Sequence, residues 1–381
     1  MRRWALSLVV LLAADWIGAQ LLVKAIPTID VPRAEREKIE RLYRVESDIY
    51  DHDLVPNFDG VGWWGPMRYP IRTNSLGFKD AAVRAVPLRG SSKRMLLIGD
   101  SVTEGIGYAY PQTFAGLIDA GMKSQGVEVL NAAVASYAPA IYFAKTRYLI
   151  EDAGLVFDEL VVFLDISDIE DEARYYDLWP DGRVSRVVHN QPGLGPEPPL
   201  KPSGPRSSAS RAPAPSVPVT WRQYLKQNSL LFRSYALARE GAWRNEGRTE
   251  VVTVPIGNPR RGFWTFSAAD FNAYGRVGLD LAVQHMDRLA DLVRAHNIRL
   301  TIAVYPWPDQ VRHDGPDSVE VTRWKSWAEQ HGARFVDLFA PFYTNTDRER
   351  TVERYFIPGD VHFNAAGHRL IADEFLNTRR P

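Results

Sequence analysis

The sequence contains no cysteine among its 381 residues. This absence excludes disulfides, thiolate metal sites and cysteine nucleophiles, so any nucleophilic catalysis must use an oxygen or nitrogen side chain. An excess of charge is also lacking, because 46 basic side chains balance 46 acidic ones. Nucleic acid and anionic membrane surfaces require a basic face on the protein, so the charge balance argues against either as the main partner.

Two further signatures are missing, namely His/Glu metal-ligand spacing and a glycine-rich phosphate loop. We therefore expect neither a metal nor a cofactor. The length suffices for one large domain or two ordinary ones with a buried core. Together these features leave specific small-molecule chemistry as the class of function to look for.

The first 26 residues carry a membrane-targeting pattern. Two arginines precede an apolar stretch, Trp4–Val23, which as a helix would span a hydrocarbon core of roughly 30 Å. Asp15 near its middle costs about 2.5 to 3.5 kcal/mol on insertion scales, and the Leu, Val and Ile residues offset this cost. We interpret residues 1–26 as a signal anchor with the remaining chain in the periplasm. The alternatives are a cleaved signal peptide, for which no well-formed cleavage site follows, and a buried core helix.

The rest of the chain divides around a proline-rich segment. Residues 190–219 hold nine prolines with Gly, Ser and Ala and almost no large apolar side chain, so we predict a disordered insertion. Residues 91–189 and 220–381 are predicted to form one catalytic domain around it. Residues 27–90, rich in Trp, Tyr, Pro and Gly, are predicted to be an irregular lead-in packed on that domain.

Short apolar runs alternate with helical patterns across the predicted domain. Continuous apolar runs of this length indicate parallel strands buried on both faces. The βαβ order therefore predicts an α/β domain with a mainly parallel five-stranded sheet. The expected strands are 95–98, 128–130, 160–164, 299–304 and 334–338, and the expected helices are 111–125, 139–153, 268–296, 318–331 and 364–377.

A candidate nucleophile follows the first expected strand directly, in the block Gly99–Gly105 (GDSVTEG). Ligands of open α/β sheets bind outside the carboxyl ends of the strands, so Ser101 at this position can attack a carbonyl carbon. A serine becomes nucleophilic at neutral pH when a base, usually histidine, accepts its proton. The alternative interpretation of Ser101 is a helix N-cap.

Of the eight histidines, His362 has the best-placed acidic neighbour. Asp360 lies two residues earlier and therefore on the same side of an extended segment. From there its carboxylate can accept the second imidazole N–H, which fixes the tautomer and stabilises the imidazolium. We predict His362 as the general base and Asp360 as its partner; the alternative is a histidine satisfied within its own loop. The other histidines, including His368 in the last helix, are expected to be structural or on the surface.

The block Gly99–Gly105 and the later Asp360–His362 resemble the SGNH/GDSL hydrolases, and the similarity covers roughly residues 45–378. Upstream, Thr73–Phe78 is similar to the membrane-anchored bacterial branch of that family. The resemblance implies a flavodoxin-like three-layer αβα sandwich, and a Ser-His-Asp mechanism that passes through an acyl-enzyme.

Two family positions are occupied by other residues here. The family's oxyanion-binding glycine is replaced by Ser136, and the asparagine of its third block is replaced by Ser167. The resemblance implies that these two serines stabilise the oxyanion, one through its backbone N–H and one through its hydroxyl. Loss of one oxyanion donor typically costs about 10²- to 10³-fold in rate, so the change puts the efficiency in question more than the mechanism.

The residues and the resemblance together predict a membrane-anchored, periplasmic serine esterase or O-acyltransferase. Its expected substrates are O-acyl esters, in the first place O-acetyl esters, of a cell-envelope or exported glycan. Proteins of an envelope assembly are the expected partners. The alternative is a catalytically weak or inactive glycan-binding component of an envelope or polysaccharide-export assembly.

Overall fold

The computed structural model describes residues 11, 13–18, 39–64, 67–187, 229, 231 and 259–379. The chain forms two compact units, one of residues 32–194 with 255–381 and one of residues 1–31 with 195–254. In the smaller unit, the Leu231 N–H donates to the carboxylate of Asp15 at 2.8 Å. No helix among the described residues is long and apolar enough to span a membrane. Most of the predicted anchor, residues 1–26, and all of the predicted disordered insertion, 190–219, lie outside the described residues.

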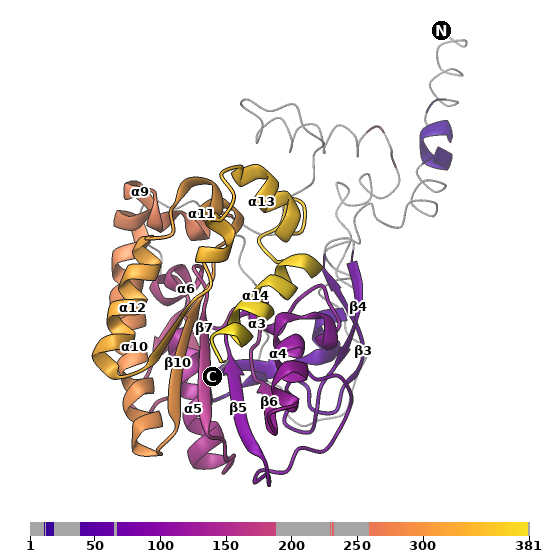
Figure 1. The fold of residues 1–381 in the computed structure, drawn as a ribbon. Coiled ribbons are helices and arrows are strands. Elements are labelled where there is room, and N and C mark those ends of the chain that lie inside the picture. Colours follow the sequence, from indigo (N-terminus) through magenta and orange to yellow (C-terminus); the bar gives the residue numbers. More distant parts are fainter. Residues whose placement is uncertain are drawn as a thin grey trace. The chain divides into compact units, whose positions relative to one another are not determined.

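A five-stranded parallel sheet forms the centre of the larger unit (Figure 1). Its order is β11-β10-β7-β5-β6, which in chain order is the flavodoxin-like 2-1-3-4-5 arrangement. The prediction of an α/β fold with five parallel strands is thereby confirmed. The strands are β5 Lys93–Ile98, β6 Val127–Asn131, β7 Glu159–Leu164, β10 Arg299–Val304 and β11 Arg334–Asp337.

Both faces of this sheet are buried, which gives the three layers that the resemblance implied. Alternate side chains of one strand point to opposite faces. Leu96 therefore belongs to one core cluster with residues of α5, α6, α10 and α12, whereas Leu97 belongs to a second with residues of α4 and α14. The flanking helices are α4 Phe114–Lys123, α5 Pro139–Arg147, α6 Asp168–Arg174, α10 Arg276–Ala295, α12 Val319–His331 and α14 Ala365–Asn377.

The long predicted helix 268–296 is helical throughout but not uniformly α-helical. The hydroxyl of Ser267 accepts the N–H of Asp270, as the capping signal indicated. The expected helix 139–153 likewise continues from α5 into a π-helical turn. The other helical elements are α3 Ser101–Glu104, α9 Ala268–Asp270, α11 Pro308–His313 and α13 Arg348–Tyr355, the 3₁₀ segments η1 Tyr110–Gln112, η3 Pro259–Thr265 and η5 Ala340–Tyr343, and the π segments η2 Tyr148–Asp152 and η4 Phe271–Gly275.

The predicted lead-in over 27–90, in the part that the structure describes, packs on the domain as expected but is not irregular throughout. Two antiparallel hairpins, β1–β2 and β3–β4, occupy it, and buried side chains such as Tyr69 and Ile71 join the main core. Gly60, Gly62 and Pro70 weaken the strand pattern in the sequence, because these residue types are depleted in strands. The strands outside the main sheet are β1 Arg44–Ser47, β2 Asp51–Leu54, β3 Asp59–Trp64, β4 Met67–Arg72, β8 Tyr176–Leu178 and β9 Val184–Arg186.

Candidate active site

Ser101 begins the short helix α3 immediately beyond the carboxyl end of β5. The strand order reverses on either side of β5, because β6 lies on one side of it and β7 on the other. Crevices for ligands form at such a switch point. The turn back from α3 passes through Gly105, whose φ of 77° is the left-handed conformation that favours glycine. The local sequence thus presents the serine hydroxyl at the functional edge of the sheet.

The three predicted catalytic residues lie in one hydrogen-bonded row. His362 Nε2 lies 2.9 Å from Ser101 Oγ, and His362 Nδ1 lies 3.0 Å from Asp360 Oδ1. The imidazole and the carboxylate are buried, whereas the serine is half-buried. The loop that carries them is fixed by backbone hydrogen bonds between Ile357 and His362 and between Asp360 and Ile357. A base, its orienting acid and a hydroxyl are therefore within the distances that proton transfer requires.

The carboxylate of Asp360 has a further partner that the sequence did not indicate. Trp64, at the end of β3 in the lead-in, donates its indole N–H to Asp360 Oδ2. The same indole lies edge-on to the ring of His362, with the ring centroids 4.9 Å apart at 75°. Both oxygens of the acid thus accept hydrogen bonds, since the N–H of Val361 also donates to Oδ1 at 2.7 Å. The lead-in thereby supplies a residue that holds the acid in place.

The electrostatics of this pair favour an imidazole that can take up a proton. Burial lowers the pKa of His362, but the charge and hydrogen bond of Asp360, together with the charges of Asp100 and Asp165, outweigh burial, so the net shift is upward from 6.5. Burial raises the pKa of Asp360, and the opposing effects of His362, Trp64 and the Val361 N–H bring it below its ordinary value. The acid therefore stays ionised at neutral pH and stabilises an imidazolium beside it.

The hydroxyl of Ser101 has one proton and two potential acceptors. Besides His362, the carboxylate of Asp100 lies 3.0 Å from Ser101 Oγ. Burial, together with the nearby Asp165, raises the pKa of Asp100 to about 7. The raised pKa favours the protonated form of Asp100, in which it competes less with His362 for the serine proton.

Asp100, Asp165 and Asp168 form the one group among the described residues whose spacing could hold a metal ion. Most of their oxygens are engaged by protein donors: Tyr305 and Trp307 donate to Asp165, each at 2.9 Å, and Tyr142 donates to Asp168 Oδ2 at 2.8 Å, whereas the buried Asp168 Oδ1 has no hydrogen-bond partner among the described residues. Burial, followed by the charge of Asp165, raises the pKa of Asp168 well above its ordinary value. These donors describe a hydrogen-bonded carboxylate cluster, and the raised pKa values of Asp100 and Asp168 favour their protonated forms.

Ser136 lies in the loop after β6 and adopts a left-handed φ of 66°. The surrounding backbone is held from three sides. The Ala135 N–H donates to Glu104 at 2.8 Å, the Ala135 carbonyl accepts from His52 Nε2 at 2.7 Å, and the Ser136 carbonyl accepts from the Tyr176 hydroxyl. These bonds fix the loop around Ser136 while using none of its donors.

Ser167 does not direct its hydroxyl toward Ser101. Its hydroxyl donates to Asp165 Oδ1 at 2.7 Å, and its backbone N–H donates to the same oxygen at 2.9 Å. The side chain is fully buried. The short hydroxymethyl group is satisfied within its own turn, where an asparagine would reach farther, so the expected oxyanion donor is occupied in this structure.

Two other buried histidines, His368 and His285, contact residues away from Ser101. His368 accepts the N–H of Phe114 through Nδ1, and burial lowers its pKa to about 3, which fits the structural role expected for it. His285 pairs with the buried Glu172 at 2.7 Å. That pairing spans 113 positions of sequence, so no local spacing could have revealed it.

No known protein-family profile and no curated protein sequence matches this chain. Solved structures with a similar backbone include TesA, at 12% identity over 76% of this chain and 99% of that one with a TM-score of 0.38. A putative lipolytic protein of the G-D-S-L family from Desulfitobacterium hafniense matches at 12% identity over 75% and 98%, with a TM-score of 0.37. The α/β hydrolase LAE5 from a Lake Arreo metagenome matches at 14% over 76% and 96%, with 0.35. At these values the likeness carries no argument about activity, which depends on the site geometry.

Proposed function

We propose that this chain is a serine esterase of the SGNH/GDSL type. The observation that carries the proposal is the row Ser101–His362–Asp360, with contacts of 2.9 and 3.0 Å at the carboxyl edge of the sheet. Three residues from two distant segments meet there, with Ser101 and His362 261 positions apart, in the order that nucleophilic catalysis requires. The upward shift of the His362 pKa adds to the proposal, because it strengthens the base that must accept the serine proton.

The proposed reaction has two halves. Ser101 Oγ attacks the carbonyl carbon of the ester while its proton moves to His362 Nε2, and the Ser136 N–H donates to the developing oxyanion. The tetrahedral intermediate expels the alcohol, which takes the proton from His362 and leaves an acyl ester on Ser101. A water molecule or an acceptor hydroxyl then attacks that ester, His362 again accepts the proton, and the serine is regenerated as the acid or the new ester leaves.

Beyond the reaction type, we also propose a substrate class and a cellular location. The resemblance to membrane-anchored relatives supports an O-acetyl ester of an envelope or exported glycan as the substrate. It also supports transfer of the acyl group to a sugar hydroxyl as an alternative to hydrolysis. The apolar stretch Trp4–Val23 supports attachment to the inner membrane with the catalytic unit in the periplasm. Proteins of an envelope assembly are the corresponding partners, and the charge balance argues against nucleic acid.

Covalent labelling tests the proposal directly. The purified full-length chain is incubated with a fluorophosphonate probe and with p-nitrophenyl acetate, and the modified residue is located by mass spectrometry. The proposal requires label and acetyl group on Ser101 and release of p-nitrophenol. Modification of the wild type at any other residue, or of none, contradicts it. Acetylated and deacetylated glycans as acceptors then separate hydrolysis from transfer.

One observation favours a second candidate, a glycan-binding protein with little or no catalytic activity. The Ser167 hydroxyl is engaged by Asp165, so the site lacks the side-chain donor that the resemblance implied for the oxyanion. The two candidates differ in one readout. A binding protein takes up glycan saturably but leaves Ser101 unlabelled, whereas an esterase is labelled whether or not glycan is present.

A further inference from the structure

The amino ends of the five parallel strands line a cavity of about 600 Å³ at the sheet edge opposite Ser101. This volume lies within the range of small-molecule sites in proteins. The ends of helices α10, α12 and α14 complete its walls through residues such as Arg294, His331 and Arg379. Each strand contributes its first residue: Lys93, Val127, Glu159, Arg299 and Arg334.

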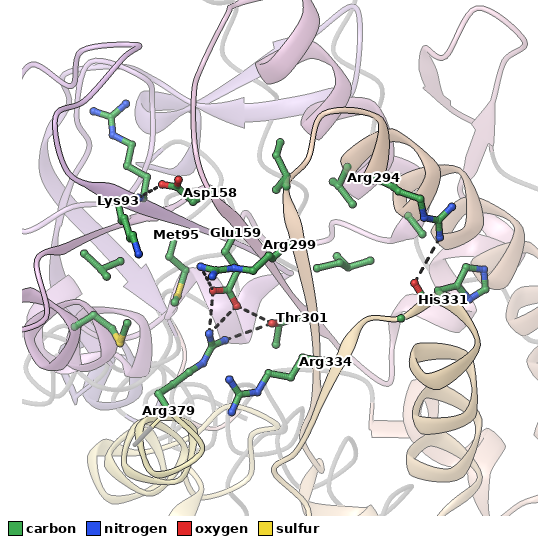
Figure 2. Close-up of a pocket in the computed structure, with 18 of the residues that line it drawn as sticks. Lys93, Met95, Asp158, Glu159, Arg294, Arg299, Thr301, His331, Arg334 and Arg379 are labelled. Atoms are coloured by element: carbon green, nitrogen blue, oxygen red, sulfur yellow. Dashed lines mark hydrogen bonds and ion pairs between the residues drawn. The ribbon is translucent and has the colours of Figure 1, made fainter. Parts of the chain in front are cut away.

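Positive charge is in excess around the buried carboxylate of Glu159, as Figure 2 shows. Arg379 Nη1 lies 2.7 Å from Glu159, and Arg299 Nη2 lies 3.5 Å from it on the other side. Thr301 also donates its hydroxyl to this carboxylate at 2.7 Å. Two guanidinium groups therefore share the charge of Glu159. The exposed Lys93 adds a third cation to the same cavity, and Asp158, which accepts the Arg94 N–H, adds a second carboxylate.

Two other arginines of the cavity have a different role. Arg334 donates to the carbonyl of Thr378 at the end of α14, and Arg294 donates to the carbonyl of His331 at the end of α12. Cations at helix carboxyl ends satisfy unpaired carbonyls and oppose the negative end of the helix dipole. Helix capping, with an ion pair between Arg294 and Asp291 at 2.7 Å, thus accounts for this pair. It does not account for Arg299 and Arg379, whose polar side-chain contacts are with Glu159 and Thr301.

The donors of Arg299 and Arg379 are only partly used. The Arg299 side chain is 66% exposed, and its contact with Glu159 is a long one, at 3.5 Å from Nη2. The Arg379 side chain is 9% exposed, yet its Nε is a buried donor with no hydrogen-bond partner among the described residues. Burial lowers the pKa of Arg379, Glu159 opposes this effect, and the charges of Arg334 and Arg299 lower the pKa further. An anion between these guanidiniums would relieve the repulsion and accept the unused donors.

We propose that this cavity binds a phosphate ester or diphosphate, with Arg299 and Arg379 as its principal ligands. A guanidinium presents two parallel N–H groups that match the spacing of phosphate oxygens, and a tetrahedral dianion accepts several such donors at once. The cavity has room for more than the phosphate group, so an organic part of the ligand lies against apolar wall residues such as Met95, Val293 and Leu300. The site is separate from the proposed esterase, and neither depends on the other.

Calorimetric titration of the full-length protein with sodium pyrophosphate at low ionic strength tests the proposal. Saturable binding of one equivalent is expected, and Arg299→Gln and Arg379→Gln each weaken it by about tenfold or more, since each removes hydrogen bonds between charged groups. Arg350→Gln on α13 is the matched control, because it removes the same charge from an exposed side chain outside the cavity. Absence of saturable binding, or equal affinity in all three variants, overturns the proposal.

Glu159→Gln gives an effect of opposite sign. The variant removes the negative charge that competes for the two guanidiniums, so pyrophosphate should bind more tightly than to the wild type, provided that circular dichroism shows the same fold. Unchanged or weaker binding in the folded variant contradicts the assigned ligands. Vesicles of phosphatidylcholine with and without phosphatidic acid identify the source of the phosphate. A soluble ester is indicated if only pyrophosphate binds, and a lipid head group if phosphatidic acid vesicles also bind and Arg299→Gln weakens both.

Discussion

The two edges of the central sheet use side chains in different ways. At the carboxyl edge, His362 and Asp360 are buried and hydrogen-bonded to each other. His362 also contacts Ser101, and Asp360 accepts a hydrogen bond from Trp64, so each contact is directional. At the amino edge, cations outnumber the carboxylates, and Arg299 and Arg379 both contact the carboxylate of Glu159. A parallel sheet brings all strand starts to one edge and all strand ends to the other, so a single scaffold can carry a reactive edge and a charged edge without mixing them.

The largest effect expected at the carboxyl edge is that of Ser101→Ala. Removing the nucleophile should lower kcat with p-nitrophenyl acetate by about 10⁴- to 10⁶-fold and abolish fluorophosphonate labelling. Ser124→Ala is the matched control, since Ser124 is exposed at the end of α4, away from the row of catalytic residues. Steady-state kinetics of both variants decide the matter. Wild-type turnover in Ser101→Ala would show that the carboxyl edge does not catalyse the reaction through Ser101.

Asp360→Asn should lower the rate and shift its pH dependence. His362 must be neutral to accept the serine proton, so kcat/KM of the wild type falls as the pH drops through the His362 pKa, which lies above 6.5. Loss of the Asp360 charge removes the largest of the effects that raise this pKa, so the midpoint moves to lower pH. The plateau falls about 10³- to 10⁴-fold, because the imidazole tautomer is no longer fixed. An unchanged midpoint in the pH–rate profile would show that this pair does not control the reaction.

Adjacent tryptophans of β3 provide a smaller and sharper test. Trp64→Phe keeps an aromatic ring beside His362 but removes the N–H that holds Asp360, so kcat should fall about tenfold with little change in KM. Trp63→Phe is the control, because the Trp63 N–H is buried without a hydrogen-bond partner among the described residues. Kinetics of the two purified variants should differ. Equal rates would mean that the lead-in only covers the site and does not position the acid.

The sequence predicted the elements that depend on local pattern. Apolar runs located all five parallel strands, and a serine after the first strand with Asp360–His362 before the last helix located the hydrogen-bonded row Ser101–His362–Asp360. Trp64 could not be assigned, because its contact with Asp360 joins positions 296 apart and its hairpin is interrupted by glycine and proline. The amino-edge cations were missed for a related reason, since they come from separate elements and form no motif in the sequence.

Tyr176→Phe should have the smallest effect on kcat, because it acts only through the loop that contains Ser136. The Tyr176 hydroxyl donates to the Ser136 carbonyl, so its loss loosens the loop and should lower kcat about three- to tenfold. Tyr274→Phe removes a comparable buried hydroxyl, which donates to the Arg260 carbonyl at 2.8 Å far along the chain from Ser136. Both variants should lose about 0.5 to 1.5 kcal/mol of unfolding free energy. Denaturant melts and kinetics together test this. If Tyr176→Phe loses stability but keeps the wild-type kcat, the loop around Ser136 does not contribute to catalysis, and the contribution of the carboxyl edge comes from Ser101, His362 and Asp360 alone.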